Sequence, residues 1–376
     1  MMNSKSKVAI LFSSYGPYHL ARVGAAASYF AEDNIEVCGV ELSRSQEEYP
    51  WETDVNTATF PIHSIIKEEK LEKTSLIVLI IKLYQMLQQI NPDFIAISGY
   101  FRPTMIFTLL WCKWFRKKAI LLSESTEIDS VRVVWKEFFK SRLLKWYDAA
   151  LVGGSPQKRY LTGLGMPSSS IFFGYNVVGN ESFHPQTIRK SARPIPHKYF
   201  LSINRFIQKK NLLLLLDAYA DYRDRLGSDS WDLVLCGDGE LKRQIQDKIQ
   251  SLKLTQFVHL TGFIQQHEML PYLAHAECFL HTSTHEQWGL VVNEAMAAAL
   301  PVIVSERCGC CEDLVRDGCN GFSFDPFDQQ QLITLMLKMT SGSVNVKAMG
   351  QTGFEHIQKF SPDYFAQGLK QSIQHA

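Results

Sequence analysis

Hydrophobic positions along the chain fall into short runs that are separated by longer segments with helical spacing. In the first half these runs are rich in β-branched residues, and we expect them to be strands at Lys7–Ser14, Ile35–Leu42, Asp93–Tyr100, Lys118–Ser125, Ala149–Gly154 and Ser170–Val178. Segments such as His19–Ala31, Ser75–Gln89 and Val131–Trp146 lie between them and have the periodicity of helices. Such alternation predicts βαβ units and a parallel sheet.

The second half repeats this arrangement. Its expected strands are Phe200–Phe206, Trp231–Gly237, Phe257–Phe263, Glu277–Ser283, Pro301–Arg307 and Gly321–Pro326. The pattern predicts an α/β chain with two Rossmann-like domains, whose parallel sheets we expect to face each other across a cleft. Between the halves, His184–His197 contains three prolines and no apolar periodicity, which is typical of a linker. We therefore expect domains at 1–185 and 186–358, and a C-terminal helix over 359–376 for which packing back on the N-terminal domain is one option.

Composition narrows the function classes. With 376 residues, 46% of them hydrophobic and 20% charged, the chain is long enough for two globular domains with large cores. The formal net charge is only +1 and no basic stripe is present, so we do not expect nucleic acid as a partner. The spacing of Cys308, Cys310 and Cys311 does not fit the paired knuckles of a zinc site. We expect free thiols and no metal.

The apolar segments bear on localisation. The first apolar run is shorter than a signal-peptide core, so we expect a cytoplasmic protein. Ser75–Leu87 and Met105–Trp114 are too short to span a bilayer, and we expect buried helices there. The lysines and arginine at 113–118 leave open a peripheral contact with anionic headgroups at the inner face of the membrane.

A second basic pattern lies between the expected strands of the first half. Arg132, Lys136 and Lys140 repeat every four residues, which predicts one basic helix face. Either this face is simply solvated or it binds a phosphorylated or lipid-linked acceptor.

Loops that follow strands are where an open parallel sheet binds its ligands. After the first strand, Gly16 allows the backbone to approach a ligand and His19 lies near the start of a helix; an ordinary tight turn is the alternative. Arg205 and Lys210 lie on either side of a strand-to-helix turn, where they are placed to hold a diphosphate; solvated charge is the alternative. The turn with Gly237 and Gly239 lacks the third glycine of a dinucleotide fingerprint, which favours a structural turn.

The strongest signal lies in the segment 277–315. Glu286 precedes an expected helix and Glu294 lies in its early turns, so both carboxylates can face one crevice. The amides of Gly289, Leu290 and Val291 form a helix amino end that suits a phosphate. This segment can therefore hold three parts of one nucleotide-sugar donor: the sugar, the ribose and the diphosphate. The alternative is that Glu294 is a surface residue of the helix and that the Ala-rich face serves only for packing.

These motifs together resemble the retaining glycosyltransferases of family 4, which have the GT-B fold. The family signature of a glutamate, seven residues, a second glutamate with Ala-Met-Ala, and then Pro-Val-Ile is found here as Glu286, Glu294–Ala297 and Pro301–Ile303. Other motifs of the family follow the same order along the chain: Arg205 and Lys210, Gly237 and Gly239, Gly262 and Phe263, Gly309 and Glu312, and then Asp317, Gly318 and Gly321.

The resemblance implies a role for each residue. Glu286 would hydrogen-bond the transferred sugar and Glu294 the ribose, while Arg205 and Lys210 would stabilise the departing diphosphate. The loop 261–264, with Gly262 and Phe263, would cover the base. Such enzymes use a nucleoside-diphosphate-sugar and neither a metal nor another cofactor, and the chain contains no Asp-x-Asp metal motif. The acceptor would be a glycan, a lipid-linked or a small-molecule hydroxyl.

Three features depart from the family pattern. Trp288 stands in place of the usual Phe, and Ala299 in place of the usual Gly. Many members have a His near the reacting sugar, where this chain has Ser123, Glu124 and Ser125. The polar partner from the first domain is therefore open among Glu124, Asp129 and His19, and capping of the following helix is the alternative for the two carboxylates.

Other functions remain in competition. A nucleotide-sugar 2-epimerase would share two Rossmann-like domains and a diphosphate site, and a non-catalytic nucleotide-sugar or glycan-binding protein could keep the same fold. An NAD-dependent oxidoreductase is disfavoured because no three-glycine fingerprint follows the first strand.

Overall fold

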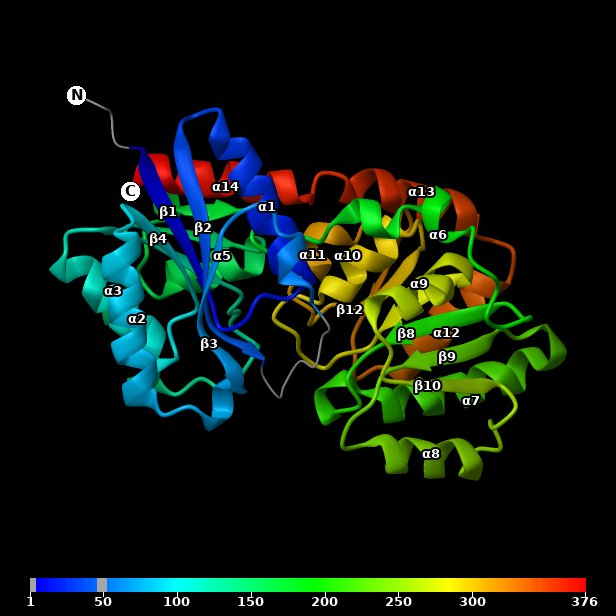
Figure 1. Ribbon diagram of the computed structural model, residues 1–376. Coiled ribbons are helices and arrows are strands. Elements are labelled where there is room, and N and C mark those ends of the chain that lie inside the picture. Colours follow the sequence, from blue (N-terminus) through cyan, green and yellow to red (C-terminus); the bar gives the residue numbers. More distant parts are fainter. Residues whose placement is uncertain (1–4, 46–52) are drawn as a thin grey trace. The chain divides into compact units, whose positions relative to one another are not determined.

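The computed structural model describes residues 5–45 and 53–376, and it contains two compact units (Figure 1). The first unit comprises the chain up to Gly179 together with Phe360–Ala376, and the second comprises Asn180–Lys359. Each unit is built on its own parallel sheet with helices on both faces. None of the helices within the described residues is long and apolar enough to cross a membrane.

The described residues of the first unit form seven strands. They are β1 (Ser6–Phe12), β2 (Ile35–Ser45), β3 (Ile62–Lys70), β4 (Phe94–Ser98), β5 (Lys118–Ser123), β6 (Ala149–Val152) and β7 (Ile171–Phe173). Its α-helices are α1 (Pro17–Ala31), α2 (Leu76–Ile90), α3 (Pro103–Trp114), α4 (Val134–Leu144), α5 (Ser155–Gly163) and α14 (Pro362–His375). The strand order is β3-β2-β1-β4-β5-β6-β7, so the direction of the connections reverses between β1 and β4.

Two layers of helices cover this sheet. On one face the side chains of α2, α3, α4 and α5 join a core that includes Leu83, Leu109, Leu144 and Leu161. On the other face α1 and α14 pack side by side (Figure 1). Their side chains Val23, Phe30, Phe365 and Leu369 lie in a second core. The C-terminal helix is therefore part of the first unit although it follows the second in sequence.

The sequence patterns missed one strand of the first unit and overestimated the burial of two of its helices. The edge strand β3 was not predicted, because its sequence ends in charged residues and lacks a regular alternation. Helix α2 was expected to be buried, but only its Leu79, Leu83, Leu87 and Ile90 are. Five of its other apolar side chains are exposed: Leu76, Ile77, Val78, Ile81 and Tyr84. Helix α3, for which burial was also expected, exposes Leu110 and Trp114.

The second unit contains six strands, and all of them were predicted. They are β8 (Tyr199–Ile203), β9 (Asp232–Cys236), β10 (Val258–Gly262), β11 (Cys278–His281), β12 (Val302–Ser305) and β13 (Gly321–Phe324). The helices are α6 (Pro185–Ile188), α7 (Leu212–Leu226), α8 (Lys242–Ser251), α9 (Gln266–His275), α10 (Leu290–Ala297), α11 (Cys311–Leu314), α12 (Gln329–Thr340) and α13 (Val346–Ile357). The strand order β10-β9-β8-β11-β12-β13 places the reversal of direction between β8 and β11.

The predicted linker has its own structure within the second unit. Pro185–Ile188 forms α6, whose Ile188 is buried. The ring of His275, the last residue of α9, contacts the carbonyl oxygen of Ser191 at 2.9 Å. The chain passes from the first unit to the second earlier, between Gly179 and Asn180.

Candidate functional site

A partly buried charged cluster of the second unit lies where its strand order reverses. The loop after β8 contains Lys209 and Lys210, and the loop after β11 contains Glu286. Since the strands are parallel and β8 pairs with β11, both loops leave the sheet at its carboxyl edge. This is the position at which open α/β sheets bind their ligands.

Glu286 holds both lysines. Lys209 Nζ donates to Glu286 Oε1 at 2.9 Å, and Lys210 Nζ donates to Glu286 Oε2. The Ser283 hydroxyl also donates to Oε2, at 3.4 Å, and Nε2 of His281 lies 3.9 Å from the same oxygen. The fold thus brings together Lys210 and Glu286, which are 76 positions apart in the sequence.

The charges of this cluster fix the protonation state of Glu286. Burial alone raises the pKa of a carboxyl, but the lysines, Lys210 above all, outweigh burial and lower the pKa of Glu286 to about 2. Burial, together with the charge of Lys210, lowers the pKa of His281 to about 3. At neutral pH the site therefore contains an ionised carboxylate, two lysines and a neutral imidazole.

Backbone contacts hold the two loops together. The Thr284 amide donates to the Lys209 carbonyl at 2.8 Å, and the Thr282 hydroxyl donates to the Lys210 carbonyl at 2.9 Å. Arg307, which follows β12, donates from Nε to the Thr284 carbonyl at 2.8 Å. The loop after β11 therefore positions the loop that contains Lys209 and Lys210, so the conformation of the latter is not set by its own sequence alone.

The glycine turn after β9 supports the loop that contains Arg205. The Phe206 amide donates to the Asp238 carbonyl at 2.8 Å. At Gly237, where φ is 141°, a Cβ would lie 1.8 Å from the Asn204 carbonyl oxygen, and at Gly239 it would lie 2.6 Å from the Phe206 carbonyl oxygen. This close approach explains the glycines, and the Arg205 side chain is left exposed beside the turn.

Helix α10 begins directly after the loop that contains Glu286. Gly289 precedes it with φ of 101°, and a Cβ there would lie 3.2 Å from His281 Nε2. The amides of Leu290 and Val291 lie in the first turn, where helical geometry provides no carbonyl partner. Trp288 is buried and donates from Nε1 to Asn293 Oδ1 at 2.9 Å, so the larger ring has its own hydrogen-bond partner.

Glu294 differs from Glu286 in its environment. It lies in α10 and is fully buried, whereas the Glu286 side chain is 13% exposed. A ribose hydroxyl could reach Glu294 only by replacing atoms that now cover it. The third predicted contact, the loop after β10, has Gly262 at φ of 74° and an exposed Phe263.

Sequence reasoning did not assign roles to Lys209, His281, Ser283 and Arg307. The only available signal was position, since His281 is a polar residue that ends a buried apolar strand and Arg307 closely follows the next one. Their meeting at Glu286 and Thr284 depends on strand pairing, which residue spacing does not reveal.

In the first unit, Gly16 and His19 are joined by a hydrogen bond. The Gly16 amide donates to His19 Nδ1 at 3.1 Å, and the imidazole lies over the Phe12 ring with centroids 4.0 Å apart. Burial, and then the charge of Arg22, lowers the pKa of His19 to about 3. With Nδ1 accepting, the neutral ring carries its proton on Nε2, so His19 is a hydrogen-bond donor and not a base at neutral pH.

The first-unit carboxylates have partners of their own. Asn176 donates to Glu124 Oε1 at 2.5 Å. Asp129 accepts from the Thr126 amide at 3.1 Å and forms an ion pair with Arg132. Helix α4 begins after Val133 without a side-chain cap, so neither Glu124 nor Asp129 caps it.

The basic helix face expected at Arg132, Lys136 and Lys140 is not formed as such. Arg132 pairs with Asp129, and Lys140 is buried beside Glu137 and the Tyr160 hydroxyl. Of the three cations only Lys136 is exposed. Internal ion pairs thus remove two of them from the surface.

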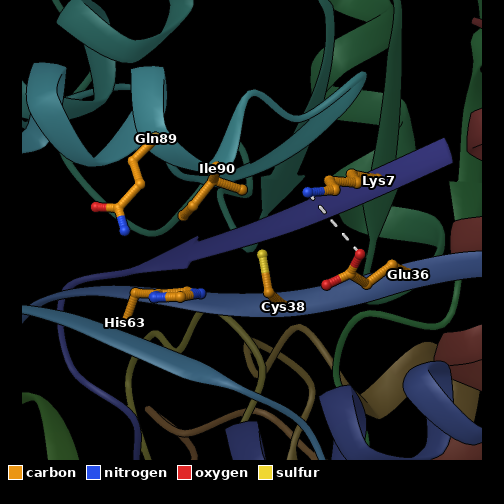
Figure 2. Close-up of a pocket in the computed structure, with 6 residues that line it drawn as sticks. All are labelled: Lys7, Glu36, Cys38, His63, Gln89 and Ile90. Carbon is orange, nitrogen blue, oxygen red and sulfur yellow. Dashed lines mark ion pairs between the residues drawn. The ribbon is translucent and has the colours of Figure 1, made fainter. Parts of the chain in front are cut away.

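A separate hollow lies at the opposite, amino end of the first sheet. Figure 2 shows its lining residues, which come from the starts of β1, β2 and β3 and the end of α2: Lys7, Glu36, Cys38, His63, Gln89 and Ile90. Lys7 and Glu36 form an ion pair at 3.9 Å, and burial raises the pKa of the Cys38 thiol to about 12. This hollow is remote from the carboxyl edge of its sheet, so we do not assign it to the candidate site.

The cysteine cluster at 308–311 is made of free thiols. Cys308, Cys310 and Cys311 are all buried. Across residues 5–45 and 53–376, no group of three or more His, Cys, Asp or Glu side chains is placed to hold a metal ion.

Comparison with known proteins identifies the second unit. Residues 184–356 match the family model of the glycosyl transferases group 1. This segment belongs to the glycosyl transferases group 1. The match covers nearly all of the second unit and includes the loops that contain Lys210, Glu286 and Glu294, so the expected family is confirmed for the unit that contains the charged cluster.

A curated relative aligns with about the same part of the chain. The α-1,3/1,6-mannosyltransferase ALG2 of Mus musculus is 31% identical over 186 residues, which are 46% of this chain and 44% of that protein. The chain spans about half the length of the curated relatives it matches.

Solved structures extend the likeness beyond the group 1 domain to the whole chain. A glycosyltransferase from Rickettsia africae superimposes with a TM-score of 0.76 at 14% identity, covering 99% of both chains. Anabaena Alr3699/HepE, in complex with UDP and glucose, gives a TM-score of 0.75 at 16% identity and covers 99% of this chain and 100% of that one. At these identities the likeness shows the fold, and it confirms the GT-B class with two Rossmann-like domains.

Proposed function

We propose that this protein is a retaining glycosyltransferase that moves a hexose-type sugar from a nucleoside-diphosphate-sugar to an acceptor hydroxyl without a metal. The observation that carries this proposal is the convergence of Lys209 and Lys210 on ionised Glu286 at the strand reversal of the group 1 domain. This cluster combines cations for a leaving diphosphate with a carboxylate for sugar hydroxyls.

The chemistry requires charge stabilisation at the leaving group. As the bond between the sugar C1 and the phosphate oxygen breaks, negative charge develops on the diphosphate. Lys210, Lys209 and the exposed Arg205 are the cations that would stabilise it, assisted by the amides at the start of α10. A bound diphosphate would compete with Glu286 for the lysines, which leaves carboxylate oxygens to accept hydrogen bonds from the sugar.

The proposed transfer proceeds on one face of the sugar. The C1–oxygen bond to the phosphate breaks with its electron pair going to the phosphate oxygen. The acceptor oxygen bonds to C1 from the same side, and its proton passes to the departing phosphate. No side chain forms a covalent intermediate, and the configuration at C1 is retained.

Two relatives favour a hexose donor. The Anabaena structure was solved with UDP and glucose, and ALG2 is named a mannosyltransferase. The acceptor in this proposal is a glycan, a lipid-linked or a small-molecule hydroxyl.

A donor screen tests the proposal. UDP-, GDP-, ADP- and dTDP-sugars are added singly in EDTA, and the melting temperature, the release of nucleoside diphosphate and the sugar product are measured. We expect one donor class to raise the melting temperature and to be turned over in EDTA. Glu286→Gln should abolish most of the turnover.

The same screen separates the competing functions. An isomerised sugar without released diphosphate would instead indicate a 2-epimerase. Binding of a donor without any turnover, or turnover that survives Glu286→Gln unchanged, would contradict the proposal and favour a non-catalytic binding protein.

A further inference from the structure

The exposed hydrophobic side chains of this protein are concentrated in one part of the first unit. All but three of the large hydrophobic side chains that the described residues expose lie between Leu76 and Trp146, and the exceptions are Tyr29, Phe263 and Phe327. Single exposed apolar residues are ordinary, but a concentration of this kind marks an interaction surface.

These side chains share one face of the first sheet. Helices α2, α3 and α4 all pack their buried residues into the same core, whereas α1 and α14 cover the opposite face. Their outward sides therefore lie on the same side of the first unit, and we call their exposed apolar side chains together the aromatic face. It is defined by Ile77 and Ile81 of α2, Trp114 of α3, and Val134, Trp135, Phe138 and Phe139 of α4.

Helix α4 is the least conventional part of this face. It buries only Lys140 and Leu144, while Val134 is 87% exposed and Trp135 is 60% exposed. A helix that packs on a sheet normally buries its largest apolar side chains. This helix presents them outward, which is unfavourable in water unless a partner covers them.

Cations are interleaved with these rings. Lys136 Nζ lies 5.5 Å from the Trp135 ring centroid, and the Arg142 guanidinium lies 4.9 Å from that of Phe138. The only acidic residue of α4 is Glu137, which is paired with Lys140. The aromatic face therefore presents apolar rings and positive charge together.

We propose that the aromatic face docks on an anionic lipid bilayer. Tryptophan, phenylalanine and aliphatic side chains insert at the boundary between headgroups and acyl chains, and neighbouring lysines and arginines pair with anionic headgroups. A second copy of the chain is a poorer partner, because a symmetric contact would bring two positive surfaces together.

The position of the face connects it with the acceptor. Phe101 follows β4, and Lys140 of α4 lies 5.0 Å from its ring centroid, while the loop with Glu124 follows β5. The face thus adjoins the carboxyl edge of the first sheet. Resting on the proposed function, this places a lipid-linked acceptor beside the loops expected to bind it.

Vesicle binding by the full chain tests the docking. Vesicles of phosphatidylcholine alone and of phosphatidylcholine with phosphatidylglycerol are sedimented with the protein at about 0.1 M and about 1 M salt, where the Debye length falls from about 10 Å to about 3 Å. We expect at least about tenfold stronger binding to the anionic vesicles at low salt.

Two sets of variants separate apolar insertion from charge. Replacing Trp135, Phe138 and Phe139 together by Ser should weaken binding at least about tenfold at both salt concentrations. Replacing Lys136, Arg142 and Lys145 by Gln should weaken it about tenfold at low salt only. Tyr29→Ser, on α1 at the opposite face of the sheet, is the matched control and should bind as the parent does.

Three outcomes would overturn the proposal: no binding of the parent chain to anionic vesicles, binding that the triple Ser variant retains, or a dimer in light scattering that this variant converts to monomer. Hydrolysis of the donor in the absence of acceptor is measured on the same proteins, and it should be unchanged in all the surface variants. Vesicle binding without donor turnover would leave the docking intact while the proposed function fails.

Discussion

The two units share a sheet topology but differ in the side chains that their loops and outer helices present. In the second unit, ion pairs tie the loops after β8 and β11 into a charged site, and only Phe263 and Phe327 of its large hydrophobic side chains are exposed. In the first unit, His19 near the start of α1 is neutral, because burial lowers its pKa to about 3, and helices α3 and α4 present aromatic rings to solvent. The topology places loops at the carboxyl edge of both sheets, but the side chains on the loops and outer helices decide whether a unit presents a charged cluster or apolar rings.

The largest effect is expected when a lysine is removed from the charged cluster around Glu286. Lys210→Met should lower kcat/KM for donor turnover by about 100- to 1000-fold, since one cation aimed at a developing anion typically contributes that much. Lys209→Met should cost about tenfold, because its side chain is 27% exposed compared with 11% for Lys210.

Lys136→Met on the first unit is the charge-matched control for these variants. With a soluble donor and no acceptor it should leave turnover at the parental level. Equal losses for all three variants would mean that total charge, and not position in the second unit, supports turnover.

The second effect tests the close backbone approach that positions Arg205. Gly237→Ala should lower the free energy of unfolding by about 3 kcal/mol, because its Cβ would lie 1.8 Å from a carbonyl oxygen and its φ is 141°. Gly342→Ala has a φ of 75° but no neighbour within 4 Å, so it should cost only about 1 kcal/mol. Urea unfolding measures both, and similar costs would show that the turn relaxes without strain.

The third prediction concerns the loss of folding stability at acidic pH. The pKa of His281 falls from 6.5 to about 3 in the folded chain, so between these values the unfolded state binds a proton that the folded state does not. Stability is therefore lost as the pH falls below about 6.5. From pH 7 to pH 5 this histidine alone should lower the free energy of unfolding by about 2 kcal/mol.

Urea unfolding of the parent and of His281→Gln at the two pH values isolates the contribution of His281 to the pH dependence of stability. The variant should lose about 2 kcal/mol less than the parent over the same interval. An identical acid dependence of both proteins would show that His281 is protonated without disturbing the fold.

The smallest effect compares one local motif in both units. Ala299 follows α10 with φ of 58°, and Leu300 donates to the Ala295 carbonyl at 3.0 Å, which is a Schellman ending. Arg116 ends α3 in the same way, with φ of 55° and a bond from Lys117 to Cys112 at 2.7 Å. Ala299→Gly and Arg116→Gly should each raise stability by about 0.5 kcal/mol, measured as a shift of the urea midpoint. A loss at both positions would show that glycine flexibility in the unfolded chain outweighs the relieved strain.

Sequence patterns predicted the sheets well because buried parallel strands are continuous apolar runs. Only the edge strand β3 was missed, since its solvent side admits Lys and Glu and breaks the pattern. The same reasoning failed for α2 and for part of α3, where apolar side chains were expected to be buried but several are exposed. Hydrophobicity reveals that a residue prefers to be covered, but it does not reveal which surface covers it.

Sequence patterns alone predict the two Rossmann-like sheets and the family of the second unit. They also place Arg205, Lys210 and Glu286 in loops after strands, and Glu294 in the helix that follows. Three features appear only in the folded chain: Glu286 bonds two lysines, Glu294 is buried, and Arg132 and Lys140 pair with Asp129 and Glu137. The physical reason is that periodicity reports local burial, whereas ionisation and exposure depend on neighbours brought close by strand pairing from distant parts of the chain.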